Sequence, residues 1–478
     1  MVAIRRRTAT LLAGAVFAGG CITVGPDYEP PEIVVADQWH QALVANLSSE
    51  ETTARWWLEL EDPLLTGLVE RAQRGSLGLE AAVARVEEAR RLLDVVAGNR
   101  VPDVNLTGGV RRSRSTLAVL PGIDPVDDFS ELSVGASWEL DFWGRVRRSV
   151  ESAQATYEAS VEAYRDVLVI LNAEVAGGYV FLRTLQERLR LAEENVERQR
   201  ETLRLVEARN RAELAPELEV QQARLNLATT EAAIPALKTA VQQTINNLST
   251  LVGEQPGALA AELVLPRPIP RPPESLAAGI PADAIRNRPD VRRAERALAA
   301  QTARIGVATS ALYPNFSLEG AFGYSAVGRA LLDDDNETWS IGPVFLWNLF
   351  DGGRVRGSIA VEEARTRQAL AAYEASVLEA LRDTENSLVA VANELERLAA
   401  LRRSVDAASR SAELVRTLYR SGLTDFQNVL DTERALFNQQ DLAARSQGEV
   451  VQNVISVYRA IGGGWSAATP VPGTEDAP

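Results

Sequence analysis

Cysteine and histidine are almost missing from this 478-residue chain, which has one of each. The lone Cys21 excludes an intramolecular disulfide, and His40 alone cannot supply the ligand cluster of a zinc or di-iron centre. The sequence also has no Gly-rich phosphate loop before a helix, and no serine or cysteine nucleophile beside a base. These absences argue against an enzyme and predict a chain without a cofactor.

Aromatic residues are also sparse, at 6%, while Ala, Leu, Val, Glu, Arg and Gln dominate the long central segments. Straight-chain residues lose little side-chain freedom in a helix, so this composition predicts long helices. The net charge is −15, and no basic stripe stands out. An acidic chain of this kind argues against nucleic acid as a partner, and the excess acid is typical of solvated helix faces.

The N-terminus has the pattern of an export signal. Three arginines at positions 5–7 precede an apolar stretch at 8–17, and small residues at 18–20 lead into Cys21. The apolar stretch is too short to span a bilayer as a helix. A cysteine directly after small residues resembles a bacterial lipobox, so we expect Cys21 to be lipidated. Leucine is usual where Ala18 stands, so an ordinary signal peptide with an incidental cysteine is the alternative.

The central part of the chain is a tandem duplication. The residues from Trp138 to Arg147 recur from Trp347 to Arg356, at an offset of 209. The same offset relates Gly253 to Gly462. A constant offset over more than about a hundred residues indicates two copies of one structural unit.

The duplication and the flanking composition divide the chain into six segments. The connector between the copies is rich in proline and irregular. The segments are a lipoprotein signal peptide at 1–20, an N-terminal flank or equatorial segment at 21–63, the first repeat at 64–253, the connector at 254–281, the second repeat at 282–462 and a C-terminal tail at 463–478.

Each repeat contains two segments that alternate between apolar and polar residues. The predicted strands are Val104–Arg114 and Phe129–Asp141 in the first repeat, and Asn315–Ser325 and Thr338–Phe350 in the second. Strands of this length with one apolar face and aromatic residues near their ends are typical of transmembrane β-barrels. A soluble antiparallel sheet that packs its apolar face on a core is the alternative.

The long helices indicate a coiled coil. The segment from Arg147 to Arg211 contains no proline, would be about 98 Å long as a helix, and keeps apolar residues at a 3-4 spacing. The second repeat has an equivalent segment, and both end at breaks, at 213–216 and 421–424. These helices are too polar to be membrane spans, so we expect them to stand in water.

Four transmembrane strands in one chain would leave two open edges, whose hydrogen bonds lipid cannot satisfy. Closure therefore requires several copies. Two copies would give eight strands and a barrel filled by side chains, whereas three would give twelve strands and an open lumen.

Several motifs, in order along nearly the whole mature chain, resemble the lipoprotein (NodT/OprM-type) branch of the TolC-like outer-membrane efflux factors. They are Cys21–Tyr28, Trp56-Trp57, Arg288–Glu295, Ile305–Ala308, Tyr313–Leu318, Tyr419–Leu423 and Val429–Phe437. Each is weak alone, but jointly they are specific.

The resemblance implies a mixed α and β fold. In it, the long helices of a homotrimer form a periplasmic α-barrel, and four strands per chain contribute to a 12-stranded transmembrane β-barrel. It also implies a lipid-anchored outer-membrane channel that docks a periplasmic adaptor and an inner-membrane pump, commonly of the resistance-nodulation-division type. The pump would supply the energy, and this chain would supply the exit.

The helix breaks are the expected functional tips, since in the family these tips meet adaptor hairpins and nearby acids narrow the closed pore. The expected docking residues are Arg211, Leu214, Arg420, Gly422 and Leu423, and the expected pore gate is Asp425 with Arg420 as its latch. Plain turns whose arginines cap helix ends are the alternative. The first repeat departs from the pattern, with Glu213 where glycine is usual and Pro216 where a polar residue is usual, which puts equal use of the two docking grooves in doubt.

Two other functional classes compete with a channel. A periplasmic adaptor would be coiled-coil and often lipidated, but it would have one hairpin and no duplicated strand unit. A purely structural coiled-coil lipoprotein would leave the alternating strands unexplained. No residue indicates the cargo.

Overall fold

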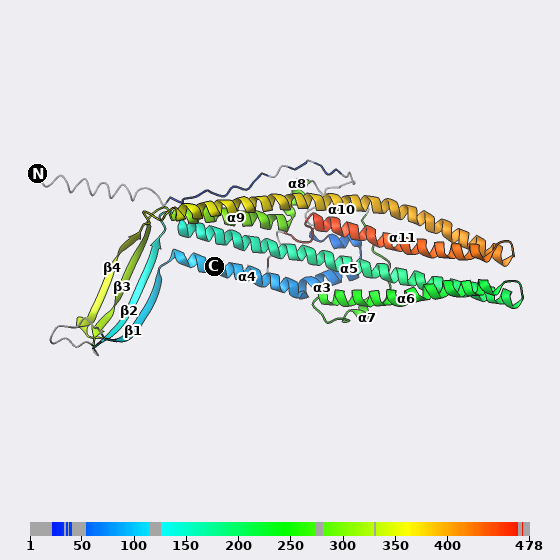
Figure 1. The fold of residues 1–478 in the computed structure, drawn as a ribbon, viewed down its shortest axis with the longest axis horizontal. Helices are drawn as coiled ribbons and strands as arrows, with labels where there is room; N and C mark the ends of the chain where they lie inside the picture. Colours follow the sequence, from blue (N-terminus) through cyan, green and yellow to red (C-terminus); the bar gives the residue numbers. More distant parts are fainter. Residues whose placement is uncertain are drawn as a thin grey trace. The chain divides into compact units, whose positions relative to one another are not determined.

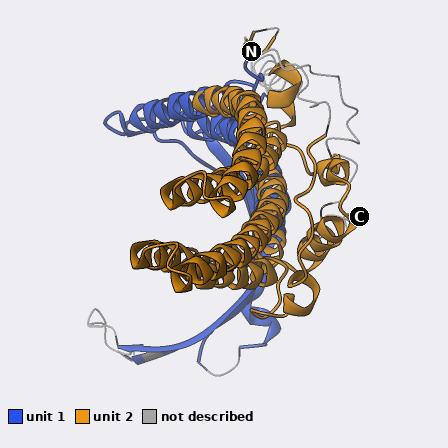
Figure 2. Ribbon diagram, turned by 90° about the vertical axis from the view of Figure 1, so that its right-hand side faces the viewer, with its two compact units in different colours: residues 1–32, 86–160, 293–374 blue, residues 33–85, 161–292, 375–478 orange. Residues whose placement is uncertain are grey.

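The computed structural model describes residues 22–32, 35–36, 38–40, 54–114, 126–273, 281–328, 331–466 and 471. Cys21, the predicted signal peptide and most of the predicted tail lie outside these residues. The chain divides into two compact units (Figure 2). Unit 1 comprises residues 1–32, 86–160 and 293–374, and unit 2 comprises 33–85, 161–292 and 375–478. Each unit takes residues from both predicted repeats, whose boundaries stay a prediction.

Unit 1 contains one four-stranded antiparallel sheet in the order β1-β2-β3-β4 (Figure 1). Its strands are β1 (Asp103–Arg114), β2 (Val126–Leu140), β3 (Asn315–Val327) and β4 (Glu337–Leu346). The four predicted strands are confirmed, and β2 pairs with β3, so the two repeats meet in the middle of the sheet. Strand β4 ends four residues earlier than predicted. Its last pair joins Leu346 to Asn315, and Pro314 before it has no N–H to continue the ladder.

The register of the sheet separates an apolar face from a polar face. Directly paired residues place their side chains on the same face. One row across all four strands is apolar throughout and consists of Leu106, Val134, Phe322 and Trp339. The next row, Thr107, Ser133, Gly323 and Thr338, has only polar side chains or none.

The apolar face of the sheet is exposed, because no other described part of this chain covers it. The side chains of the apolar row are between 44% and 71% exposed. A soluble sheet would cover such a face with a core, because exposed apolar area of this extent is unfavourable in water. The soluble-sheet alternative is therefore wrong for the part of the chain that the structure describes.

The helices repeat with the offset found in the sequence. Helices α5 (Arg145–Arg211) and α10 (Arg354–Arg420) have 67 residues each, and α6 (Glu217–Leu251) and α11 (Phe426–Ala460) have 35 each. All four pairs of bounds differ by 209 residues, which confirms the duplication. At 1.5 Å per residue, α5 and α10 are about 100 Å long.

The remaining helices are shorter. They are η1 (Trp56–Leu60), α3 (Pro63–Gly75), α4 (Leu77–Ala97), η2 (Gly98–Arg100), α7 (Ala260–Leu263), α8 (Pro281–Asn287), α9 (Pro289–Ser310) and η3 (Asp334–Asn336).

The main core lies in unit 2, where η1, α3 and α7 pack against α5, α6 and α11. Trp56 stacks on Tyr458 with ring centroids 5.3 Å apart, and Tyr179 donates a hydrogen bond of 2.6 Å to Asp62. Asp62 also caps the first turn of α3. These contacts hold the segment before the first repeat against the long helices.

One window of α5 is apolar enough to cross a membrane by length and composition. The premise that the long helices are too polar to be membrane spans is therefore wrong for the composition of this window. However, 61% of the window is buried inside the structure. Residues such as Val175, Tyr179 and Leu182 are fully buried in the core of unit 2, so packing between helices accounts for the apolar stretch.

Candidate functional site

Helices α5 and α6 form one helical hairpin, and α10 and α11 form the other. The turns that connect the two helices of each hairpin, here called the tips, have the same backbone geometry. Glu213 and Gly422, which occupy equivalent positions, both have a left-handed backbone, with φ of +57° and +75°. The following residues, Leu214 and Leu423, donate their N–H to the helix end at the same distance of 2.9 Å. Gly422 adopts this conformation at little cost because glycine has no Cβ, whereas Glu213 adopts it without being glycine.

Both tips present an arginine and a leucine to the surroundings. Arg211 and Arg420 end their helices and are exposed. Leu214 is 68% exposed and Leu423 is 73% exposed. Each tip thus combines a cationic and an apolar side chain at its surface, and the docking role of these residues stays a prediction.

The predicted latch between Asp425 and Arg420 does not form within one chain. Asp425 precedes α11 and is exposed, and its carboxylate makes no capping hydrogen bond. No ion pair joins it to Arg420 among the described residues, and Arg420 instead lines a groove with α5 and α11. A latch between different copies stays a prediction.

Behind the tips, a cluster that the sequence did not reveal joins the two hairpins. The guanidinium of Arg209 lies 4.6 Å above the ring of Tyr419 and donates a hydrogen bond of 2.7 Å to its carbonyl. The Tyr419 hydroxyl donates to Glu219, and burial together with this acceptor raises the pKa of Tyr419. Val206 and Phe426 belong to the apolar part of the cluster. The only sequence signal was that the tyrosine lies directly before the tip arginine.

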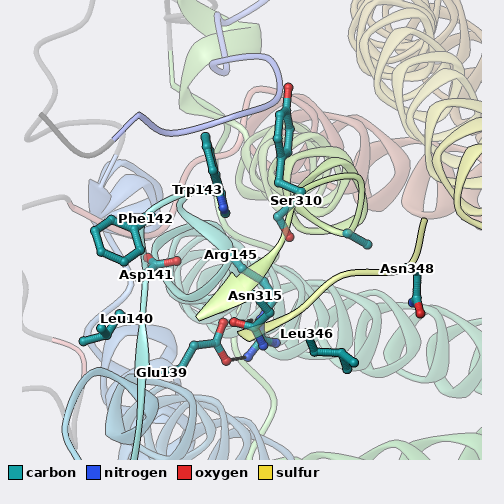
Figure 3. A pocket seen from close by; sticks show the side chains of 12 residues that line it. Glu139, Leu140, Asp141, Phe142, Trp143, Arg145, Ser310, Asn315, Leu346 and Asn348 are labelled. Carbon is teal, nitrogen blue, oxygen red and sulfur yellow. Dashed lines mark hydrogen bonds and ion pairs between the residues drawn. The ribbon is translucent and has the colours of Figure 1, made fainter. Parts of the chain in front are cut away.

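A pocket of about 180 Å³ lies where the strands of unit 1 meet the helices (Figure 3). Trp143 stacks on Tyr313 with centroids 4.6 Å apart, and its indole N–H donates to Pro314. Glu139 forms an ion pair with Arg145, and Asp141 forms one with Arg147.

Both carboxylates of this pocket are thus paired with arginines. Asp141 additionally accepts the backbone N–H groups of Val146 and Arg147, which start α5. The residues around the pocket therefore stabilise the junction between strand and helix, and Glu139 and Asp141 are both engaged in ion pairs. In the described part of the chain, no group of three or more His, Cys, Asp or Glu could hold a metal.

The segment after Cys21 is fixed on unit 1. The buried Arg148 donates to the carbonyls of Val24 and Gly25 and forms an ion pair of 2.7 Å with Asp27. Gly25 has a φ of +89° and touches Gly306, where a Cβ would lie 2.4 Å from the Gly306 Cα. This close approach sets the path of the chain that leads to the predicted lipidation site.

Comparisons with known proteins agree with this architecture. The family model described as "Outer membrane efflux protein" matches residues 68–254 and 280–463. Nodulation protein T of Rhizobium leguminosarum bv. trifolii is 30% identical over 94% of this chain and 95% of its own length. The pyoverdine export outer membrane protein OpmQ of Pseudomonas aeruginosa is 31% identical over 96% of this chain and 97% of its own length.

A solved structure of the outer-membrane channel OprN has a TM-score of 0.84 and 34% identity, covering 92% of this chain and 99% of that chain. The expected channel fold, its place in the outer membrane and the resemblance to the TolC-like factors are confirmed. The two alternatives, a periplasmic adaptor and a structural lipoprotein, are therefore set aside. With its family model matched in both repeats, the chain belongs to the outer membrane efflux protein family.

Proposed function

We propose that this chain is the passive exit duct of a tripartite efflux system and closes one β-barrel from three copies. The sheet carries this proposal. Its apolar face is exposed, and in the described residues the outer edges of β1 and β4 pair with no strand. In lipid those edges need partners, and β4 of one copy with β1 of the next supplies them. Three four-stranded sheets give twelve strands, enough for an open lumen.

The two faces of the sheet then have separate roles. The row from Leu106 to Trp339 faces lipid, and the polar row that contains Thr107 and Ser133 faces the lumen. Neighbouring polar rows add Glu131 and Glu319, which keep the lumen wet. A lumen of this kind lets cargo pass without chemistry, so the chain needs no catalytic centre.

The energy comes from the partners of the duct. The pump is an inner-membrane protein, of the resistance-nodulation-division type, and a periplasmic adaptor joins it to the tips. Arg211 and Leu214 in one tip, and Arg420, Gly422 and Leu423 in the other, form the docking surface. Their exposure and their repeated arginine-leucine pattern support this role.

Asp425 is the proposed pore-narrowing acid, and Arg420 of a neighbouring copy is its latch. Three copies of an ionised aspartate around one axis repel each other, so a closed ring needs cations nearby. Asp425 has no cationic partner within its own chain in the described structure, which leaves its carboxylate available to a neighbouring copy.

Lipidation of Cys21 anchors the N-terminus next to the barrel. Each buried CH₂ of an acyl chain contributes about 0.8 kcal/mol, so several chains hold firmly. Mass spectrometry of the mature protein should find the acylated cysteine, and an unmodified N-terminus would contradict lipidation. Cys21→Ala should stay in the membrane, because the barrel anchors independently.

Cysteine cross-linking tests barrel closure. In a Cys21→Ala background, Thr107→Cys on β1 is combined in turn with Thr338→Cys, Ser340→Cys and Gly342→Cys on β4. At least one combination should give disulfide-linked dimers and trimers on a denaturing gel. The control pair, Ser137→Cys with Glu319→Cys, joins register partners of β2 and β3 and should give only intramolecular bridges.

Light scattering, which measures the mass of the protein in detergent, can contradict barrel closure. A well-folded monomer in detergent, with no intermolecular bridge from any β1–β4 combination, would refute the shared barrel. The tips are tested separately by Gly422→Pro, since proline cannot adopt a φ of +75°. This variant should lose efflux complementation at a normal trimer and membrane level, whereas Ser421→Ala should retain it. Efflux by Gly422→Pro would show that the tip assignment is wrong.

A further inference from the structure

A groove of about 350 Å³ lies between α5, α10 and α11, and the residues that line it all belong to unit 2. Its wall contains a buried acid, Glu433 of α11, which is only 6% exposed. One carboxylate oxygen of Glu433 accepts hydrogen bonds from Thr202, at 2.6 Å, and from Arg416, at 3.4 Å. The acid therefore connects all three helices.

The other oxygen of Glu433, Oε2, is buried and receives no hydrogen bond in the described structure. Gln199, one turn before Thr202 on α5, is 4% exposed, and its Oε1 is also buried without a donor. Residues three apart share a helix face, so Gln199 and Thr202 face the same neighbour. Two buried acceptors without donors in one wall are costly, because each has lost its hydrogen bonds to water.

The surrounding charges do not compensate the carboxylate fully. Burial raises the pKa of Glu433, and hydrogen bonds and charge from Thr202, Arg416 and Arg198 lower it only in part. Burial also lowers the pKa of Arg198, whose guanidinium contacts the neutral Gln440.

The other charged groups lie farther out. Glu413 and Arg420 line the exposed side of the groove from α10, and Glu201 of α5 lies 3.8 Å from Arg416. From α6, the neutral Asn226 accepts a hydrogen bond from Arg434, next to Glu433. Together these groups leave the pKa of Glu433 raised, which shifts its carboxyl toward the neutral form.

We propose that Glu433 is a proton-binding site that fastens the two helical hairpins to each other. The protonated carboxyl gains an O–H that can donate to Gln199, and it removes the buried charge. The ionised carboxylate leaves both acceptors without donors and loosens α11 from α5. The bound ligand is a proton, and its binding is linked to the packing of the hairpins.

The direction of the pH dependence follows from linkage. The packed state binds the proton more tightly than the loosened state, so packing is strongest at low pH and weakens as pH rises through the carboxyl pKa. A duct whose hairpins must move to open would be held shut in an acidic periplasm. This inference rests on contacts within one chain, so it stands or falls independently of barrel closure and of adaptor docking.

Hydrogen–deuterium exchange of the full-length protein in detergent tests the proposal between about pH 5 and about pH 8, a range that lies above the ordinary glutamate pKa of about 4.3, on the side toward which burial shifts it. After correction for intrinsic exchange, peptides from 195–206 and 426–440 should be several-fold better protected at the lower pH. Glu433→Gln places a neutral donor at the same position and should remain protected at both. Glu413→Gln, which removes an exposed acid of the same groove, should keep the wild-type dependence.

A second variant keeps the test decisive if Glu433→Gln does not fold. Thr202→Val removes a donor that favours the ionised form, so the pH at which protection is lost should move upward. Wild-type protection that does not change with pH, a Glu433→Gln variant with wild-type dependence, or an unmoved transition in Thr202→Val would each overturn the proposal.

Discussion

Each helical hairpin tip has one residue with a left-handed backbone, and substitutions at these two residues should change the stability of the tips in opposite directions. Gly422 has a φ of +75°, and a Cβ added there would meet nothing within 4 Å, so Gly422→Ala changes only backbone strain and chain entropy. A left-handed residue other than glycine costs about 1–2 kcal/mol. The alanine recovers about 0.4–1 kcal/mol by restricting the unfolded chain. The net loss at this tip should be about 0.5–1 kcal/mol.

Glu213 is the mirror case. It already carries the strain at a φ of +57°, so Glu213→Gly should stabilise the other tip by about 0.5–1 kcal/mol, from the same two terms. Because 1.4 kcal/mol corresponds to a factor of ten, these effects are about two- to fivefold changes in exchange protection of the tip peptides.

Local hydrogen exchange is the suitable assay, since fraying of a helix end does not move the global melting temperature. Glu213→Ala is the matched control, because it removes the carboxylate but keeps the strain, and it should leave protection unchanged. If Glu213→Ala protects the tip as much as Glu213→Gly, backbone strain is not the cause. If Gly422→Ala and Glu213→Gly change the exchange protection of their tips in the same direction, backbone strain does not explain the effects.

Three further predictions concern the sheet, the N-terminal segment and the gate. Val134→Arg should lower the outer-membrane level of folded trimer, because arginine on a lipid-facing position costs about 2–4 kcal/mol. Ser133→Arg, on the opposite face of the sheet, should be tolerated. Equal levels of the two variants would contradict the assignment of the faces. Gly25→Ala should release residues 22–32 to limited proteolysis, since its Cβ would overlap Gly306, while Gly357→Ala, which meets open space, should not. Asp425→Ala should raise single-channel conductance in planar bilayers, whereas Asp431→Ala, within the α11 helix that follows Asp425, should not. Wild-type conductance in Asp425→Ala would place the gate elsewhere.

The sequence predicted the elements more accurately than their contacts. The offset of 209, the absence of proline and the Gly422 turn were enough to place both long helices and their breaks within a few residues. The strands followed from period-two alternation, except that β4 ends at Leu346, where Pro314 in the neighbouring segment stops the ladder. Each of these features depends on residues close together in the chain.

The pairing of β2 with β3 and the contacts between the hairpins could not be read in the same way. Both join residues about 200 positions apart, and nothing local specifies the partner. Gln199 lies between Val196 and Leu203 at the 3-4 spacing of the apolar residues in α5, which is a sequence sign of a buried polar contact. The Asp425–Arg420 pair was expected from the resemblance to the family, but the two side chains do not meet within one copy.

The duplication itself shows where the two hairpins differ in their side-chain contacts. At the offset of 209, Glu433 of α11 corresponds to Arg224 of α6, whose guanidinium forms an exposed ion pair of 2.9 Å with Glu207. Tyr419 likewise corresponds to Asn210, whose side chain donates a hydrogen bond within its own tip, to the carbonyl of Ala215. The elements are repeated almost without change, but the buried polar contacts are not. A closed ring built from identical hairpins would have equivalent grooves, whereas this chain places its buried acid in one kind of groove only. The proposed proton-linked contact therefore occurs once per chain, and a trimer would have three of them.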